Sequence, residues 1–160
     1  MTDTSPTQRV AELISDHRIA MLTTRNEEGR LAAHPLTVQE SEFDGDLWFL
    51  VSKSSTFASD LRGDAHAGIS LSSGSSWVSL SGQAHLVEDP AKVHELWSSM
   101  YEAWFPQGVD DPDLGLLRFT AESAEYWDSP GGKIAAAFSL VKAKLTGERY
   151  QGENETVELP

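Results

Sequence analysis

The sequence predicts a mainly β fold with helices at its periphery, and three observations support this prediction. Short β-rich runs separated by turn residues fill most of the chain between residues 19 and 127. Longer runs with apolar residues at helical spacing occur near the start, in the middle and near the end. The length of 160 residues suits one domain with its own core, so we expect residues 1–160 to form a single domain.

The first helix is predicted from Ser5-Pro6, where a capping residue is followed by proline at the first helical position. Val10, Leu13 and Ile14 follow at spacings that put them on one helical face. We expect a short amphipathic helix that opens the domain. Residues 1–8 are expected to be peripheral or flexible.

Two β-rich runs, 19–24 and 31–39, flank turn residues at 26–29, and together they predict a hairpin. A second turn, at 43–45, leads to a further run at 47–51. This run is apolar throughout, which favours a strand that is buried on both faces. We therefore place it centrally in the sheet.

Ser54 and Ser55 precede a short helical pattern that ends at Gly63, which predicts a capped helix. Strands are then expected at 67–72 and 77–87, on either side of a turn. In the second of these runs, polar and apolar residues alternate, as they do in a strand with one buried face.

Asp89-Pro90 marks the start of the middle helix, because a capping residue is again followed by proline. The helix is expected to carry a stripe of apolar and aromatic residues at three- and four-residue steps: Val93, Leu96, Trp97, Met100, Tyr101 and Trp104. Packing against a core or a dimer interface is the favoured interpretation of this stripe, and cofactor binding is the alternative.

The last strands are expected at 114–120 and 124–127, joined by a turn at 121–123. An alanine-rich helix follows at about 133–144. The tail at 146–160 is polar and acidic, so we expect a peripheral or flexible terminus. An arm docked on a partner subunit is the alternative interpretation of this tail.

Charge and cysteine content exclude several classes of partner and chemistry. Twelve Lys and Arg against twenty-five Asp and Glu give a net charge of −13, which disfavours nucleic acid and anionic membranes as partners. The absence of cysteine excludes disulfides, thiolate catalysis and cysteine-ligated metals, and it suits a reducing compartment. No apolar run is long enough to span a bilayer, so we expect a cytoplasmic protein.

Eight short segments match one known family in consistent order. They are M-L-T-T at 21–24, G-R-L at 29–31, D-L-W-F-L at 46–50, S-L-S-G-Q-A at 79–84, L-W at 96–97, W-F-P at 104–106, D-D-P-D at 110–113 and A-E-Y-W-D at 124–128. Between about Val10 and Leu159 the chain resembles the general stress protein 26 branch of the pyridoxamine 5'-phosphate oxidase-like, FMN-binding split barrels. The W-F-P and E-Y-W-D segments are specific to this branch. The resemblance implies a six-stranded antiparallel split barrel.

The resemblance also implies that FMN lies in a groove at a homodimer interface, with its phosphate near the second and third strands and the next helix start. The implied cofactor-binding residues are His34, Pro35, Leu36, Val51, Ser52, Lys53, Ser55 and Thr56. His34 stands where the family has arginine, and Phe57 where it has lysine. Each charge-assisted contact with phosphate contributes roughly 1.5–3 kcal/mol, so we expect flavin binding to be weak or absent.

Partial replacements for the two cations are present nearby. Lys53, the hydroxyls of the 52–56 segment and the free N–H groups of the following helix are each able to contact an anion. Two alternatives stay open: Ser54 or Ser55 only caps the helix, and His34 is an ordinary strand residue.

No catalytic residue is identified by motif, and no metal site is expected because the histidines are too scattered. Any redox chemistry would belong to the flavin. The first functional hypothesis is a flavin-dependent oxidoreductase acting on a small molecule. The alternative is a non-catalytic flavin-binding, storage or stress protein whose cofactor site is weakened or lost. Use of a deazaflavin or haem ranks last, because it rests on fold analogy alone.

Overall fold

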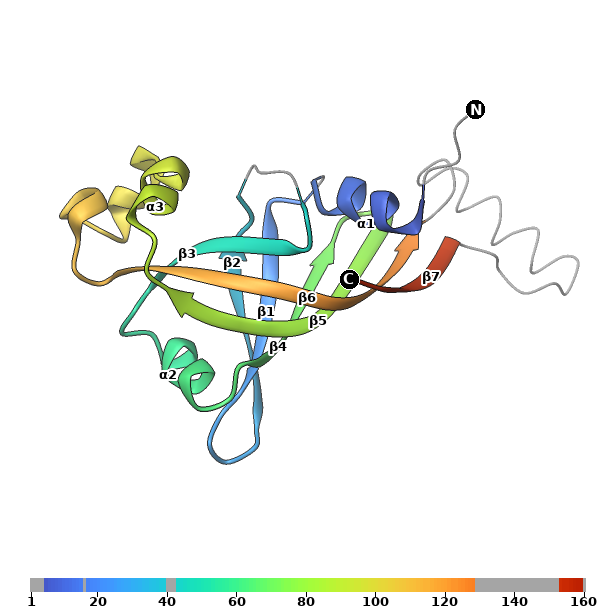
Figure 1. The fold of residues 1–160 in the computed structure, drawn as a ribbon, viewed down its shortest axis with the longest axis horizontal. Helices are drawn as coiled ribbons and strands as arrows, with labels where there is room; N and C mark the ends of the chain where they lie inside the picture. The colour runs from blue at the N-terminus through green and yellow to red at the C-terminus, as the bar shows by residue number, and fades with distance from the viewer. Residues whose placement is uncertain (1–4, 16, 40–42, 129–152, 160) are drawn as a thin grey trace, which may run out of the picture.

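The computed structural model describes residues 5–15, 17–39, 43–128 and 153–159, and it is mainly β, as predicted (Figure 1). The elements in chain order are α1 (Pro6–Ser15), β1 (Ile19–Arg25), β2 (Leu31–Thr37), β3 (Asp46–Ser52), α2 (Thr56–Gly63), β4 (His66–Ser72), β5 (Ser76–Val87), α3 (Pro90–Leu96), the 3-10 helices η1 (Ser99–Ala103) and η2 (Gly108–Asp110), β6 (Leu114–Asp128) and β7 (Glu153–Glu158). The alanine-rich helix expected at 133–144 lies outside the described residues. None of the described helices is long and apolar enough to cross a membrane.

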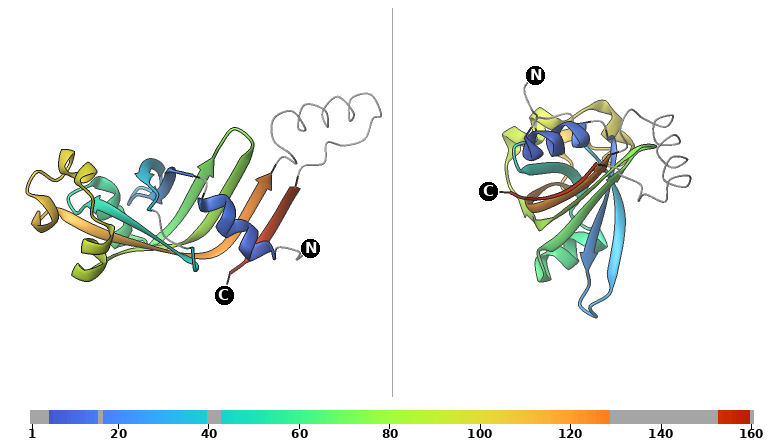
Figure 2. Two further views of the ribbon diagram at one scale, coloured as in Figure 1. Left: turned by 90° about the horizontal axis from the view of Figure 1, so that it is seen from above. Right: turned by 90° about the vertical axis from the view of Figure 1, so that its right-hand side faces the viewer.

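The strands form one antiparallel sheet in the order β2-β1-β4-β5-β6-β3, and β7 pairs with β6 beside this path. The strands β2 and β3 stand at opposite ends of the hydrogen-bonded path, yet they contact each other. The sheet therefore curls round on itself, as the two perpendicular views in Figure 2 show. The six-stranded split barrel predicted from the resemblance is confirmed, and β7 adds one strand to it.

Strand β3 is not central, which corrects the placement made from its apolar sequence. Among the described residues it pairs only with β6. Its two faces are buried for different reasons: Phe49 faces the main core, while Leu50 packs with Tyr101 and Phe105 in a second cluster. The segment that follows α3 covers the outer face of β3. This end strand is therefore buried on both faces, which suits its apolar sequence.

Strand β6 runs through the turn that was expected at 121–123. Ser81 pairs with Ser123 but Gly82 pairs with Ala121, so Glu122 is the extra residue of a β-bulge. A side chain at position 82 is excluded, because a Cβ there would lie 2.0 Å from the carbonyl oxygen of Thr120. The chain bends at this point instead of reversing.

The middle helix is shorter than predicted. It ends at Leu96, Trp97 is extended with ψ 138°, and the chain then enters the 3-10 helix η1. Serine competes for backbone hydrogen bonds in helices, and two serines follow Trp97. Tyr101 packs in the second cluster, as the packing interpretation predicts, whereas Met100 and Trp104 are 54% and 68% exposed.

Helix α1 confirms the predicted start and the predicted buried face. The Gln8 N–H donates to the Ser5 hydroxyl at 3.2 Å, and the Ser5 N–H donates to the Gln8 side chain at 2.9 Å. Val10, Leu13 and Ile14 are all buried. The helix packs against β5 and β7, and it lies at the other end of the molecule from α3 (Figure 1).

Part of the acidic tail forms strand β7, which neither interpretation of the tail predicted. It pairs antiparallel with β6 of the same chain, from Ser123 opposite Glu158 to Asp128 opposite Glu153. Val157 is buried in the main core and Leu159 packs against it. The segment is thus held both by backbone pairing with β6 and by two apolar residues near its end.

The outer face of the sheet carries small residues next to exposed aromatic ones. Burial alternates along β4 and β5, and their outward positions include Gly68, Ser70, Ser79 and Ser81. Trp77 and Trp127 pair across β5 and β6 at one end of this face and remain 44% and 39% exposed. The face is therefore flat in the middle and apolar toward its edge.

Candidate functional site

Strand β2 carries three of the predicted cofactor-binding residues, and their side chains do not share one face. Leu36 packs against the main core and His34 is half-buried, whereas Pro35 is exposed and pairs with Met21. Successive side chains of a strand point to opposite faces. The His34 and Pro35 side chains therefore point to opposite faces of β2.

The structure brings His34 and Phe57 together from β2 and α2. Their ring centroids are 4.9 Å apart and their planes meet at 41°. Nε2 of His34 is buried and has no hydrogen-bond partner among the described residues. The two positions at which the resemblance implies cations are thus occupied by one aromatic pair.

The turn between β3 and α2 is held together by Asp113, which sequence reasoning did not select. The hydroxyls of Ser52 and Ser54 donate to Oδ2 of Asp113, the second at 3.2 Å, and the Ser54 N–H donates to Oδ1 at 2.9 Å. The hydrogen bond from Ser52 makes the largest contribution to lowering the pKa of Asp113 below its ordinary value. Asp113 is therefore ionised at neutral pH, and this turn already contains an anion.

Helix α2 begins with a capping residue, as one of the two interpretations of this segment predicts. Ser55 accepts a hydrogen bond from the Ala58 N–H at 3.3 Å. Thr56 is exposed at the first helical position. Val51, on the strand before the turn, is buried in the main core.

Lys53, in the same turn, also helps to lower the pKa of Asp113 and contacts a second acidic residue. Its Nζ is 3.4 Å from Oε1 of Glu88. Lys53 and Glu88 line a cavity of about 150 Å³ together with residues of α3, including His94. A water molecule occupies about 30 Å³ of liquid, so this cavity holds a few waters and is too small for a flavin ring.

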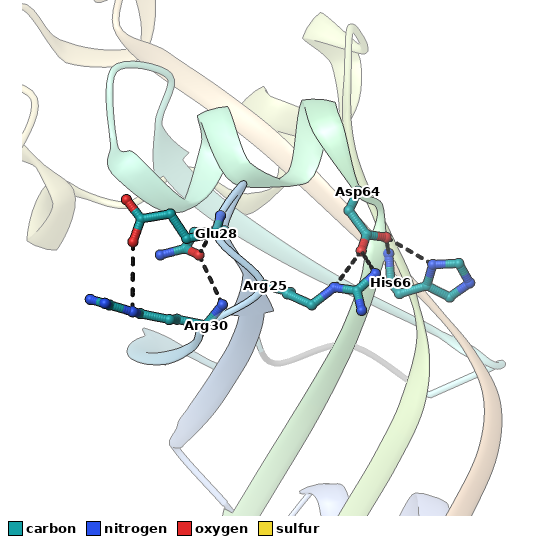
Figure 3. A network of polar contacts seen from close by, with 6 residues as sticks. Arg25, Glu28, Arg30, Asp64 and His66 are labelled. Carbon is teal, nitrogen blue, oxygen red and sulfur yellow. Dashed lines mark hydrogen bonds and ion pairs between the residues drawn. The ribbon is translucent and has the colours of Figure 1, made fainter.

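Asp64 links the end of β1 to the start of β4 near α2 (Figure 3). His66 Nδ1 lies 2.8 Å from Oδ1 of Asp64, and Nη2 of Arg25 lies 2.7 Å from Oδ2. The hydrogen bond from the His66 side chain, followed by that from Arg25, lowers the pKa of Asp64 to about 2. Arg25 is therefore paired with a carboxylate that stays ionised in all but strong acid.

A groove of about 1050 Å³ opens where β2 ends. It lies between the α1–β1 corner and the segment formed by α3 and η1. Its lining residues are Ile14, Ser15, His17, Arg18, Ile19, Thr37, Val38, Gln39, Glu95, Leu96, Ser98, Met100 and Tyr101. Small-molecule sites typically enclose about 300–1,000 Å³ and combine apolar walls with a few polar groups, and this groove has that character.

Polar groups with unused hydrogen-bonding capacity lie in this groove. The Gln39 amide donates to the Tyr101 hydroxyl, which leaves the Gln39 carbonyl oxygen as an acceptor and the Tyr101 O–H as a donor. His17 is 6% exposed, its Nδ1 lies 2.5 Å from the Leu13 carbonyl oxygen, and its Nε2 has no partner among the described residues. A ligand edge with both a donor and an acceptor would complement Gln39 and Tyr101.

Sequence reasoning missed the groove because its residues come from segments up to about ninety positions apart. The one available signal was the stripe that contains Tyr101, for which cofactor binding was the less favoured interpretation. Among the described residues, no three His, Asp or Glu side chains gather closely enough to bind a metal ion.

Residues 5–151 match the family described as pyridoxamine 5'-phosphate oxidase like. The chain belongs to this family. The pyridoxamine 5'-phosphate oxidase-like assignment agrees with the split barrel and with the order of the segments that first indicated it. The general stress protein 26 branch is supported by a solved structure of that description at 28% identity.

Individual relatives agree with the family assignment. The chain is 27% identical to protein bli-3 of Neurospora crassa over 151 aligned residues. The aligned region covers 87% of this chain and 72% of bli-3. A general stress protein 26 from Jannaschia has a TM-score of 0.76 and 28% identity over 96% of this chain and 98% of its own. The general stress FMN/FAD binding protein of Xanthomonas citri has a TM-score of 0.68 and 28% identity over 79% of this chain and 93% of its own.

Proposed function

We propose that this chain binds a flavin and acts as a flavin-dependent oxidoreductase on a small molecule. The groove at the end of β2 is the observation that carries the proposal, because its volume is large enough for a flavin ring. Membership of the pyridoxamine 5'-phosphate oxidase-like family and the similarity to a flavin-binding stress protein support the same choice of cofactor.

The groove residues suit the ring of a flavin. Val38, Leu96 and Met100 supply apolar contacts, and Gln39 with Tyr101 supplies the acceptor and donor that the polar edge of the ring requires. A bound flavin supplies transfer of a hydride or of single electrons. The protein residues would orient the ring and exclude water from one of its sides.

We further propose that the active form is a homodimer, joined through the outer face of the sheet. Ser70, Ser79 and Ser81 leave this face flat enough for close approach, and Trp77 and Trp127 expose aromatic surface beside them. Exposed apolar surface of this kind marks interaction sites. We place the protein in the cytoplasm, a proposal supported by its lack of cysteine.

The dimer is tested by measuring the molar mass with size-exclusion chromatography and light scattering. We expect a dimer for the unmodified chain and a monomer for Ser79→Arg, which places a charge in the middle of the flat face. Ser99→Arg is the matched control, because Ser99 is exposed on η1 and away from that face. A monomeric unmodified chain would contradict the proposal.

The cofactor is tested by the visible absorption spectrum of the purified protein and by titration with flavins. We expect flavin binding at one site per chain and reduction of the bound flavin by a nicotinamide nucleotide. Ser98→Trp places a ring in the groove and should weaken binding, whereas Ser99→Trp, one residue outside the lining, should not. A colourless protein with no measurable flavin affinity would overturn the proposal.

A second candidate is a flavin-binding or storage protein without turnover, or one with a weakened site. The arrangement around Asp113 and the pairing of His34 with Phe57 favour it, because neither offers a cation to the cofactor. Tight flavin binding without reduction over a panel of donors and acceptors would favour this candidate over the oxidoreductase.

A further inference from the structure

The floor of the groove at the end of β2 brings two polar side chains together. The pairing of β1 with β2 continues past the strand ends, because the Val38 N–H donates to the Arg18 carbonyl oxygen at 2.8 Å in the same register. One step further, this register brings His17 opposite Gln39. Side chains that face each other across antiparallel strands share one face, with Cβ atoms about 4.5–5.5 Å apart. His17 and Gln39, which both line the groove, are therefore neighbours in it.

Tyr101 adds a third polar group from the opposite wall. It is buried on η1, and its hydroxyl accepts a hydrogen bond from the Gln39 amide. Strand β2 lies between β1, with which it pairs, and β3, whose outer face Tyr101 covers. Gln39 therefore stands between His17 on one side and Tyr101 on the other.

His17 presents an acceptor in its neutral form. Its Nδ1 lies 2.5 Å from the Leu13 carbonyl oxygen, which can only accept, so Nδ1 carries the proton and Nε2 holds a lone pair. The two nitrogens point in nearly opposite directions, so Nε2 is turned away from α1. Nε2 is buried and has no partner among the described residues, which is unfavourable for an acceptor. Contact with a ligand requires the imidazole to turn toward the groove, and the bond to Leu13 limits that turn.

The three side chains form an ordered row of two acceptors and one donor. The acceptors are Nε2 of His17 and the carbonyl oxygen of Gln39, and the donor is the Tyr101 O–H. The complementary ligand edge has two adjacent donors followed by one acceptor. A 2-amino-4-oxopyrimidine ring has this edge in its amino group, its ring N–H and its carbonyl oxygen. The pyrimidine edge of a flavin has one N–H between two carbonyl oxygens, so it matches Gln39 and Tyr101 but places an acceptor opposite His17.

We propose that the groove binds a 2-amino-4-oxopyrimidine ring, the ring of pterins and of guanine, and that His17 selects for its amino group. A flat bicyclic ring also suits the apolar residues that line the groove: Ile14, Ile19, Val38, Leu96 and Met100. The inference goes beyond the proposed flavin-binding function and does not depend on it. Because both kinds of ring would use Gln39 and Tyr101, they would exclude each other from the groove.

The experiment titrates the full chain with matched pairs of ligands at neutral pH, followed by isothermal calorimetry. Pterin and lumazine differ only at one position, where the amino group of pterin is a carbonyl oxygen in lumazine. We expect the dissociation constant of pterin to be about tenfold or more below that of lumazine, because lumazine places an acceptor opposite Nε2 of His17. Guanosine and inosine form the second pair, since inosine lacks the amino group. The tighter of pterin and guanosine identifies the source of the ring.

Two outcomes on the unmodified chain would overturn the inference. One is an equal dissociation constant within each pair. The other is the failure of both pterin and guanosine to bind. Flavin binding in the absence of pterin and guanosine binding would leave the proposed function intact and overturn this inference alone.

Variants separate the contact with the amino group from the contact that both ligands share. His17→Leu removes the acceptor and should abolish the preference for pterin over lumazine. Tyr101→Phe removes the donor to the carbonyl oxygen that both ligands carry, so it should weaken both and leave their ratio unchanged. His94→Leu is the matched control, because His94 is exposed on α3 and lines the smaller cavity instead of the groove. An undiminished preference in His17→Leu would contradict the assignment of His17.

Discussion

The turn after β3 and the groove at the end of β2 differ in how their polar groups are satisfied. In the turn, donors from Ser52 and Ser54 meet the carboxylate of Asp113. In the groove, Gln39 and Tyr101 are paired with each other and retain capacity for a further partner. Buried polar groups in folded proteins are nearly always paired. A turn whose serine donors meet a carboxylate supports the fold, whereas a groove with unused donors and acceptors is suited to a ligand.

The largest effect that separates the two regions is expected from Asp113→Ala. It removes the acceptor of three hydrogen bonds and leaves two hydroxyls and one N–H without it, so Tm should fall by several degrees. Asp110→Ala is the control for the change in net charge, because Asp110 is exposed on η2. Thermal unfolding followed by circular dichroism measures the difference. Equal Tm values for the two variants would show that Asp113 does not hold the turn.

Acid should weaken the α2 end before it affects the groove. The pKa of Asp113 is lowered and that of Asp64 is about 2, so the folded state holds both carboxylates ionised where the unfolded chain takes up protons. Their stabilisation is complete above about pH 4, the ordinary range for Asp, and is lost as the pH falls through the lowered values.

Unfolding by urea at several pH values tests this expectation. The stability difference between the unmodified chain and Asp113→Asn should stay constant from pH 7 to pH 5 and should shrink below pH 4. For Asp64→Asn, the stability difference from the unmodified chain should be lost between about pH 4 and pH 2. A difference that grows in acid would reverse the assigned direction of the pKa shifts.

In the groove, Tyr101→Phe should have a smaller effect. The change removes the hydroxyl that accepts from the Gln39 amide, and it should lower the free energy of unfolding by about 1 kcal/mol. A double-mutant cycle with Gln39→Leu isolates the interaction between the two side chains. Gln39→Leu should lower the free energy of unfolding by less in the Tyr101→Phe background than in the unmodified chain. Fully additive effects in urea unfolding would indicate that the two side chains do not interact.

The smallest effect is expected at the rim of the turn, from Glu88→Gln. Glu88 is 85% exposed and Lys53 is 38% exposed, and exposed ion pairs contribute about 0.2–1 kcal/mol at most. The free energy of unfolding should change by less than about 0.5 kcal/mol, and this change should shrink as salt is added. A larger loss would place Lys53 among the residues that hold the turn.

Local chemistry made much of the fold predictable. Ser5-Pro6 and Asp89-Pro90 both start helices where the sequence predicts them, and Ser55 caps α2. Gly29 takes the positive φ of 80° that its turn requires. Each of these features depends on residues within a few positions of one another, so the local sequence is enough to predict it.

Features that depend on distant contacts were not predictable. Leu50 is buried on the outer face of β3 by Tyr101 and Phe105, about fifty positions later in the chain. The bulge at Glu122 follows from the close approach of Gly82 to Thr120. In the candidate site, Asp113 belonged to a segment already recognised as a family motif, but its partners Ser52 and Ser54 lie about sixty positions before it. The site needed the three-dimensional arrangement of β3, α2 and β6.

The pairing of β7 with β6 has a consequence for synthesis of the protein on the ribosome. Strand β6 already pairs with β3 and β5, and its residues 123–128 receive their second neighbour only when residues 153–158 have emerged. Until then this stretch is an open edge with unpaired backbone groups, and Trp127 lies on it. A nascent chain paused before residue 153 would be exposed to pairing with other chains, so rapid completion or a chaperone at this stage favours a correctly folded product.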